Sequence, residues 1–148
     1  MTSRMSLAIV GSRRFANPDW LRLSKMTIAW FLANVRPSGV VSGGAMGIDT
    51  LAEEQAKLLG FPVRVFLPER RCWESYRERN LQVVCACDAL LCIRDRDSSS
   101  FGSGWTRDAA VKAGKPVWSV EIPPDRLKWR ELPMPPQVWF DDLRRKRT

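Results

Sequence analysis

Residues 40–51, VVSGGAMGIDTL, decide the fold. Val40 and Val41 are apolar and β-branched, which favours a buried strand, and Gly43-Gly44 ends that strand. A helix is predicted from this turn to about Leu59, with Gly60 as its C-terminal cap. A strand that passes through a glycine-rich turn into a helix is the repeating unit of a parallel α/β sheet.

The same unit recurs along the chain. Short apolar runs predict further strands at 7–10, 63–67, 89–93 and 117–120, and helices are predicted at 19–35, 74–86 and 105–113. Strands that alternate with helices imply right-handed crossovers. The sequence therefore predicts an α/β protein with a Rossmann-like three-layer fold, whose mostly parallel sheet has about five or more strands.

The composition changes after residue 120. Five of the ten prolines lie in residues 121–148, together with Trp129, Trp139 and Phe140. Proline disfavours a regular sheet element, whereas the aromatic side chains need burial. We expect one folded domain at 1–120 and, at 121–148, an extended arm with a basic terminus that packs on the domain or on a neighbouring subunit.

Composition narrows the functional classes. The 148 residues are 45% hydrophobic and 27% charged, and no run approaches the ~18 apolar residues of a membrane span, so we expect a globular cytoplasmic protein without a membrane partner. The chain has no histidine and no C-x-x-C pair, which excludes a Cys/His zinc site and removes every nucleophile–histidine pair. We expect no cofactor and no metal, with Cys85, Cys87 and Cys92 buried as small apolar residues.

The net charge of +8 falls mostly within residues 1–120. It suits an anionic ligand, either a small phosphate compound or a nucleic-acid backbone, although a solvated basic surface would give the same excess.

Three glycine-rich loops follow predicted strands: residues 11–14, 43–47 and 98–106. Ligands of parallel sheets bind where strands end, and a helix N-terminus there offers unpaired amides to an anion. Each loop taken alone is also consistent with a plain turn or a flexible connector. The predicted ligand-binding residues in and beside these loops are Gly11, Ser12, Arg13, Gly43, Gly44, Gly47, Asp49, Gly102, Ser103, Gly104 and Thr106.

Several side chains allow two interpretations. Arg13 can clamp a phosphate or simply carry surface charge. Asp49 can bond a ribose hydroxyl or stabilise the start of its helix. Glu53, one turn after Asp49, can face the same site or be a solvated helix position, and Thr106 either caps its helix or donates to a phosphate. The aromatic residues Trp73, Tyr76 and Trp105 are candidates for stacking on a base, but aromatics at such boundaries usually close a core.

Together, residues 41–52, Gly11-Ser12-Arg13, Arg79-Asn80 and residues 87–89 look like the SLOG superfamily. That superfamily includes the lonely-guy phosphoribohydrolases, DNA-processing protein A and the small YspA-like proteins, and this chain most resembles the last group over about residues 7–120. The resemblance implies a Rossmann-like fold that binds nucleotides or derivatives of them, often as a homodimer, with Asn80 near the ligand.

The lonely-guy enzymes use an arginine and a glutamate for catalysis, and the resemblance places these on Arg79 and Asp108. Here the loop departs from the family pattern, because its Gly-Thr pair is interrupted by Trp105 and the carboxylate is an aspartate, which is one methylene shorter. Three functions stay open: binding of a nucleotide-derived small molecule, nucleoside monophosphate phosphoribohydrolase activity, and single-stranded nucleic-acid binding.

Overall fold

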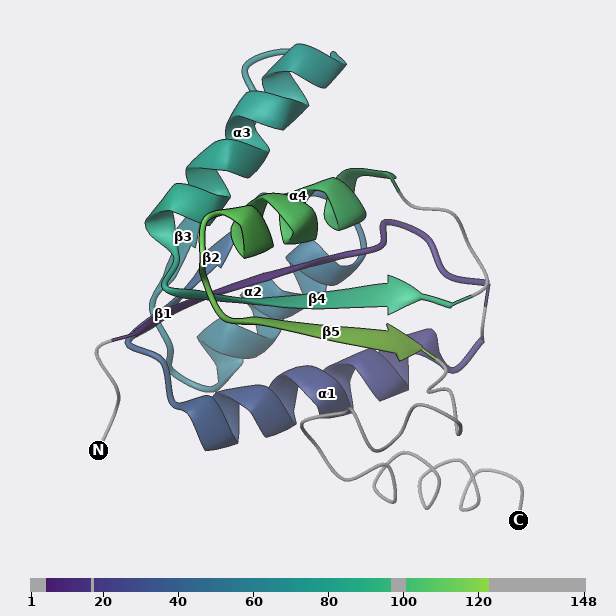
Figure 1. The fold of residues 1–148 in the computed structure, drawn as a ribbon. Coiled ribbons are helices and arrows are strands. Elements are labelled where there is room, and N and C mark those ends of the chain that lie inside the picture. The colour runs from purple at the N-terminus through teal and green to yellow at the C-terminus, as the bar shows by residue number, and fades with distance from the viewer. Residues whose placement is uncertain (1–4, 17, 97–100, 123–148) are drawn as a thin grey trace.

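The computed structural model describes residues 5–16, 18–96 and 101–122. It contains a five-stranded sheet in which every neighbouring pair of strands is parallel, and the strand order is β3-β2-β1-β4-β5 (Figure 1). The elements along the chain are β1 (Ser6–Gly11), α1 (Trp20–Val35), β2 (Gly39–Ser42), α2 (Ile48–Leu58), β3 (Val63–Val65), α3 (Trp73–Ala86), β4 (Ala89–Asp95), α4 (Phe101–Lys112) and β5 (Val117–Ile122). The predicted Rossmann-like α/β fold is confirmed.

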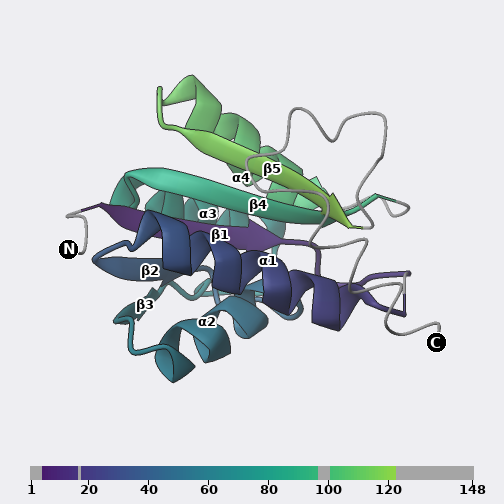
Figure 2. The same cartoon turned by 90° about the horizontal axis from the view of Figure 1, so that it is seen from below.

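Two helices cover each face of the sheet. Helices α1 and α2 lie on one face, and α3 and α4 on the other (Figure 2). The alternation of side chains along β1 explains both layers, since Leu7 and Ile9 join the core under α1 and α2, while Ala8 and Val10 join the core under α3 and α4. Strand β1 is therefore buried on both sides and anchors the whole molecule.

The strand order creates a switch point at the centre of the sheet. From β1 the chain proceeds outward through β2 and β3, then crosses to the other side of β1 to add β4 and β5. The connections after β1 and β4 consequently leave in opposite directions. In sheets of this kind ligands bind outside the carboxyl ends of the strands at this point.

Some predicted boundaries were wrong. Helix α4 begins at Phe101 and not at Trp105, so Gly102, Ser103 and Gly104 lie in a first helical turn instead of a connecting loop. Strand β3, at the edge of the sheet, ends at Val65 and not at Leu67. Cys87 and Cys92 are buried as expected, but Cys85 is exposed, because it lies on the outward side of α3.

The proposed arm at 121–148 lies outside the described residues beyond Ile122. Across the described ranges, no helix is long and apolar enough to cross a membrane.

Candidate functional site

The loop after β1 is tied to two other elements by Ser12. The Ser12 amide donates to the Ile93 carbonyl at 3.0 Å, and the Ser12 hydroxyl accepts from the Asp95 amide at 2.9 Å. Its carbonyl accepts from the Ile48 amide at 3.2 Å. Ser12 is completely buried and thus fastens the end of β1 to β4 and to the start of α2.

Two of the predicted glycines are required by close approaches within the protein. A Cβ at Gly11 would lie 2.1 Å from the Ile93 carbonyl oxygen. Gly47 has a φ of +80°, and a Cβ there would lie 2.4 Å from the Ser12 carbonyl oxygen. The backbone of β4 and the Ile48 side chain therefore fill the space at Gly11, and the backbone of the β1 loop fills the space at Gly47.

The turn between β2 and α2 is closed by its own polar side chains. The Gly44 amide donates to the Ser42 hydroxyl at 3.1 Å, and that hydroxyl donates to Glu53 at 2.8 Å. The Ala45 amide donates to the Asp49 carboxylate at 3.3 Å. Two amides predicted to face an anion are thus bound within the protein, and Glu53 is a hydrogen-bond partner instead of a purely solvated residue.

Helix α3 reaches this turn through Arg79 and Asn80, which are 6% and 8% exposed. Nη1 of Arg79 donates to the Gly43 carbonyl, and Nε donates to Oδ1 of Asn80 at 2.9 Å. A Cβ at Gly43 would lie 2.9 Å from Oδ2 of Asp49 and 3.1 Å from Cδ of Arg79. Glycine at this position lets the carboxyl group and the arginine side chain approach the same stretch of backbone.

The electrostatics of this cluster are set by burial. Burial raises the pKa of Asp49 from 3.8 to about 7, against the lowering effects of the Ala45 amide and of Arg79. Burial also lowers the pKa of Arg79, and the positive charge of Arg13 lowers it further. The Cζ atoms of Arg13 and Arg79 lie 5.2 and 5.8 Å from the centre of the Tyr76 ring. Two guanidinium groups therefore lie close to one ring, in a cluster that also holds the buried carboxyl group of Asp49.

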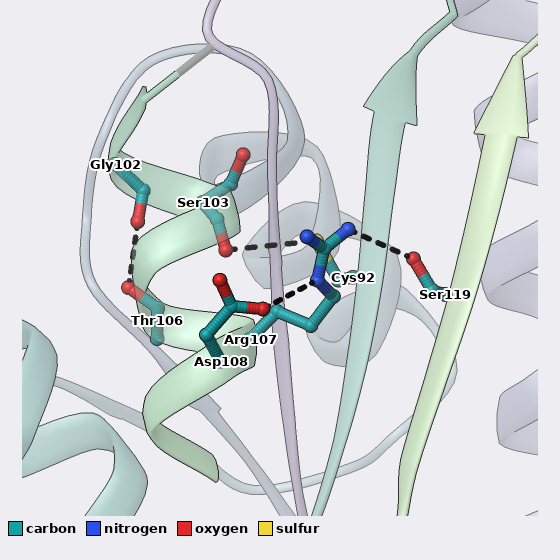
Figure 3. A network of polar contacts seen from close by, with 7 residues as sticks. All are labelled: Cys92, Gly102, Ser103, Thr106, Arg107, Asp108 and Ser119. Atoms are coloured by element: carbon teal, nitrogen blue, oxygen red, sulfur yellow. Dashed lines mark hydrogen bonds and ion pairs between the residues drawn. The ribbon is translucent and has the colours of Figure 1, made fainter. Parts of the chain in front are cut away.

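The first two turns of α4 form a second polar group (Figure 3). Thr106 donates to the Gly102 carbonyl at 2.9 Å, and the Cys92 thiol donates to the Ser103 carbonyl at 3.8 Å. Ser103 and Thr106 are buried. Because α4 begins at Phe101, Thr106 lies one turn inside the helix and bonds the carbonyl four residues back, so the interpretation of Thr106 as the helix cap is excluded.

The two glycines of this turn have different surroundings. Apart from its chain neighbours and the nearby backbone of α4, no atom of the described residues lies within 4 Å of a Cβ built at Gly102, whereas a Cβ at Gly104 would lie 3.5 Å from the Arg94 guanidinium. A cation therefore stands beside the N-terminal turn of α4.

Asp108, the proposed catalytic acid, has its side chain 65% exposed. It accepts from Nε of Arg107 at 3.2 Å, and Nη1 of Arg107 continues to the Ser119 hydroxyl at 3.4 Å on β5 (Figure 3). Arg79 bonds Gly43 and Asn80 instead. The two residues of the predicted catalytic pair thus have separate sets of partners.

The sequence prediction missed the central position of Ser42. The available signal was a hydroxyl residue at the end of an apolar strand, directly before two glycines. Tyr76 was considered only for base stacking, and nothing in the sequence placed it between two arginines that are 66 residues apart. Among the described residues, no group of three or more acidic or cysteine side chains is arranged so that it could hold a metal ion.

Comparison with known proteins gives the same fold. The family model of DNA recombination-mediator protein A matches residues 1–70. No curated protein matches the chain in sequence. DNA processing protein A from Streptococcus pneumoniae is 21% identical with a TM-score of 0.65, and the match covers 83% of this chain and 52% of that one. This chain thus spans about half of the pneumococcal protein.

Two other solved structures are similar across most of the chain. DNA processing protein A from Helicobacter pylori is 21% identical with a TM-score of 0.64, over 97% of this chain and 82% of that one. That structure concerns the single-stranded DNA binding mode of the Helicobacter protein. The molybdenum cofactor binding protein from Rippkaea orientalis is 16% identical with a TM-score of 0.65, over the whole of both chains. The similarity to these proteins confirms the Rossmann-like fold, and at these identities the solved structures establish the fold alone.

Proposed function

We propose that this chain binds a nucleotide, or a compound derived from one, through its phosphate at the carboxyl edge of the sheet beside Arg13. The observation that carries the proposal is the pair of guanidinium groups at Tyr76, 5.2 and 5.8 Å from its centre. The carboxyl group beside them, Asp49, has its pKa raised to about 7. Near neutral pH Asp49 carries only part of a negative charge, so Arg13 and Arg79 together outweigh Asp49 and Glu53, and a phosphate neutralises the remaining positive charge.

The residues have different roles in this proposal. Arg13 is exposed and contacts the phosphate directly, whereas Arg79 and Asn80 are buried and hold the turn after β2 in place. Asp49 is a positioning residue, because its carboxylate binds the Ala45 amide. Gly11, Ser12 and Gly47 bring the β1 loop and α2 together, which fixes where Arg13 leaves the sheet.

The first turn of α4 supplies a further contact. Its amides at Gly102 to Gly104 carry the positive end of the helix dipole, and Arg94 lies beside them.

The experiment compares Arg13→Ala with Arg14→Ala, since both arginines are exposed neighbours in one loop. Binding of adenosine monophosphate is measured by titration calorimetry. Loss of a charge-assisted hydrogen bond costs about 1.5–3 kcal/mol, so Arg13→Ala is expected to weaken binding about 10- to 100-fold. Arg14→Ala is the matched control and retains the native affinity. Equal losses in the two variants would indicate a general effect of surface charge and overturn the proposal.

A second candidate function is single-stranded DNA binding. It is favoured by the match of residues 1–70 to the DNA recombination-mediator model and by the exposed arginines Arg70, Arg71 and Arg77 next to Trp73. A strand and a free nucleotide share their base and phosphate chemistry, so both would use the same edge of the sheet. A steep dependence of affinity on salt separates the strand from the nucleotide.

The phosphoribohydrolase alternative has less support. It requires Arg79 and Asp108 to act on one bond, yet Asp108 is exposed and pairs with Arg107. Under the binding proposal, adenosine monophosphate is recovered intact after incubation with the native protein. Release of free adenine, abolished by Asp108→Ala, would favour the enzyme instead. Assembly as a homodimer stays a prediction.

A further inference from the structure

The inward side of α3 changes its chemistry along the helix. At the C-terminal end, Val83 and Val84 are buried in the core under α3 and α4. One turn earlier, Arg79 and Asn80 lie at the turn after β2. At successive earlier turns on this same side stand Tyr76 and Trp73, because residues three or four apart share one side of a helix. The N-terminal half of α3 extends away from the sheet (Figure 1).

Trp73 and Tyr76 belong to this N-terminal half of α3. Within the described residues, neither of the two apolar cores includes Trp73, Tyr76 or Trp105, either as a buried member or as a half-buried neighbour. Trp73 remains 39% exposed. Its ring meets that of Trp105 on α4 edge to face, with the centres 5.7 Å apart and the planes at 89°. The aromatic group thus has a defined orientation and an accessible surface.

The aromatic group adjoins the cationic one. Tyr76 lies one turn from Trp73 and carries the Arg13 guanidinium at 5.2 Å. A nucleotide has the same two parts, an aromatic base and an anionic phosphate, joined by a sugar. The order Trp105, Trp73, Tyr76, Arg13 therefore matches the order of base and phosphate in a nucleotide.

We propose that Trp73, supported by Trp105, stacks on the base of the nucleotide whose phosphate binds Arg13. This inference rests on the proposed function, which assigns only the contact with the phosphate, and it adds the contact with the base. Stacking accepts any base, since every base has a π face, and larger purine rings gain more contact than pyrimidines. The ligand class is a nucleotide with an aromatic base, purine in preference to pyrimidine.

The test separates base from phosphate by titration calorimetry with adenosine monophosphate and with ribose 5-phosphate. Trp73→Leu keeps an apolar contact with Trp105 but removes the π face, and it is expected to weaken binding of adenosine monophosphate about 10-fold or more. Its affinity for ribose 5-phosphate stays unchanged. Trp73→Phe restores most of the affinity for the nucleotide. Leu81→Ala, at a position that is 40% exposed on the same helix, is the matched control and binds both compounds as the native protein does.

The outcomes distinguish this inference from the proposed function. If native protein binds both compounds and Trp73→Leu binds adenosine monophosphate with native affinity, base stacking is wrong and phosphate binding stands. If Trp73→Leu weakens both compounds equally, Trp73 supports the structure of the site and does not contact a base. If native protein binds neither compound nor any other nucleoside monophosphate, the proposed function and the stacking inference both fail. Circular dichroism melting verifies that each variant is folded.

Discussion

Asp49 is a carboxyl group that is 5% exposed in the first turn of α2. Its Oδ2 accepts from the Ala45 amide and lies close to Gly43, so the side chain organises the turn after β2. Burial disfavours its charged form and raises its pKa to about 7. The folded state therefore holds a proton on Asp49 at pH values where the unfolded chain has lost it.

This difference gives a signed prediction for stability. Between the unfolded pKa of 3.8 and the folded value of about 7, the native state binds more protons, so the contribution of Asp49 to the free energy of unfolding falls as pH rises. Asp49→Asn removes this titration. We therefore expect the free energy of unfolding of the variant, relative to that of the native protein, to rise by about 2 to 3 kcal/mol from pH 5 to pH 8. Urea unfolding at pH 5, 6, 7 and 8 measures the difference between the two proteins. Taking the difference between the two proteins cancels the pH dependence that other groups contribute to both, such as Asp88, whose pKa is lowered by the Ser6 amide and hydroxyl. A constant difference across this range would contradict the assignment.

At the scale of the element, α3 carries most of the site, and its position is fixed at its C-terminal end by Lys115. Nζ of Lys115, in the loop before β5, donates to the carbonyls of Val84, Cys85 and Cys87. A cation at a helix C-terminus binds otherwise unpaired carbonyls and interacts favourably with the helix dipole. One lysine thus connects the end of α3 to the chain between α4 and β5.

We expect Lys115→Met to destabilise the protein by about 1 to 2 kcal/mol, because it leaves these carbonyls without their charged donor. Lys112→Met is the matched control, since Lys112 is exposed in the last turn of α4, and its effect should stay within about 0.5 kcal/mol. Chemical denaturation midpoints measure both variants. If Lys112→Met is as costly as Lys115→Met, the capping role of Lys115 is refuted.

At the scale of the whole molecule, the net charge of +8 favours polyanions as well as small phosphates. The exposed arginines Arg13, Arg70, Arg71 and Arg77 lie on and around the α3 side of the molecule. If each neutralises one phosphate of a single strand, the logarithm of affinity falls with the logarithm of salt with a slope of about −3. Affinity for an oligonucleotide then drops roughly 50-fold between 50 and 200 mM salt.

Fluorescence anisotropy with a labelled oligothymidine measures this slope. Arg71→Ala should reduce its magnitude by about 0.7, the contribution of one phosphate contact. Lys25→Ala, which removes an exposed cation from α1 on the opposite face, should leave the slope as it is in native protein. Binding that is insensitive to salt would remove single-stranded nucleic acid from the candidate functions.

The sequence by itself determined the order of the elements and the layered fold. Runs such as residues 7–10 are apolar at every position because a central parallel strand is buried on both faces, and that pattern is local. The sequence predicted Gly11 and Gly47 as site residues but not why glycine is required there, since a sequence does not show that the Ile93 carbonyl lies against Gly11 or the Ser12 carbonyl against Gly47. The start of α4 was misplaced because glycines at 102 and 104 have low helix propensity, which tertiary packing overrode.

Only the tertiary structure decided which side chains form the site. Arg13 comes from the β1 loop, whereas Tyr76 and Arg79 come from α3. Although the loop and the helix are far apart in sequence, these three side chains meet at the carboxyl edge of the sheet. The structure also separated Asp108 from the partners of Arg79, as the orientation of α4 points Asp108 toward solvent and Arg107. The pKa of Asp49 likewise depends on burial by elements distant in the chain. Local patterns fix secondary structure, whereas the charges that face one another depend on how the layers pack.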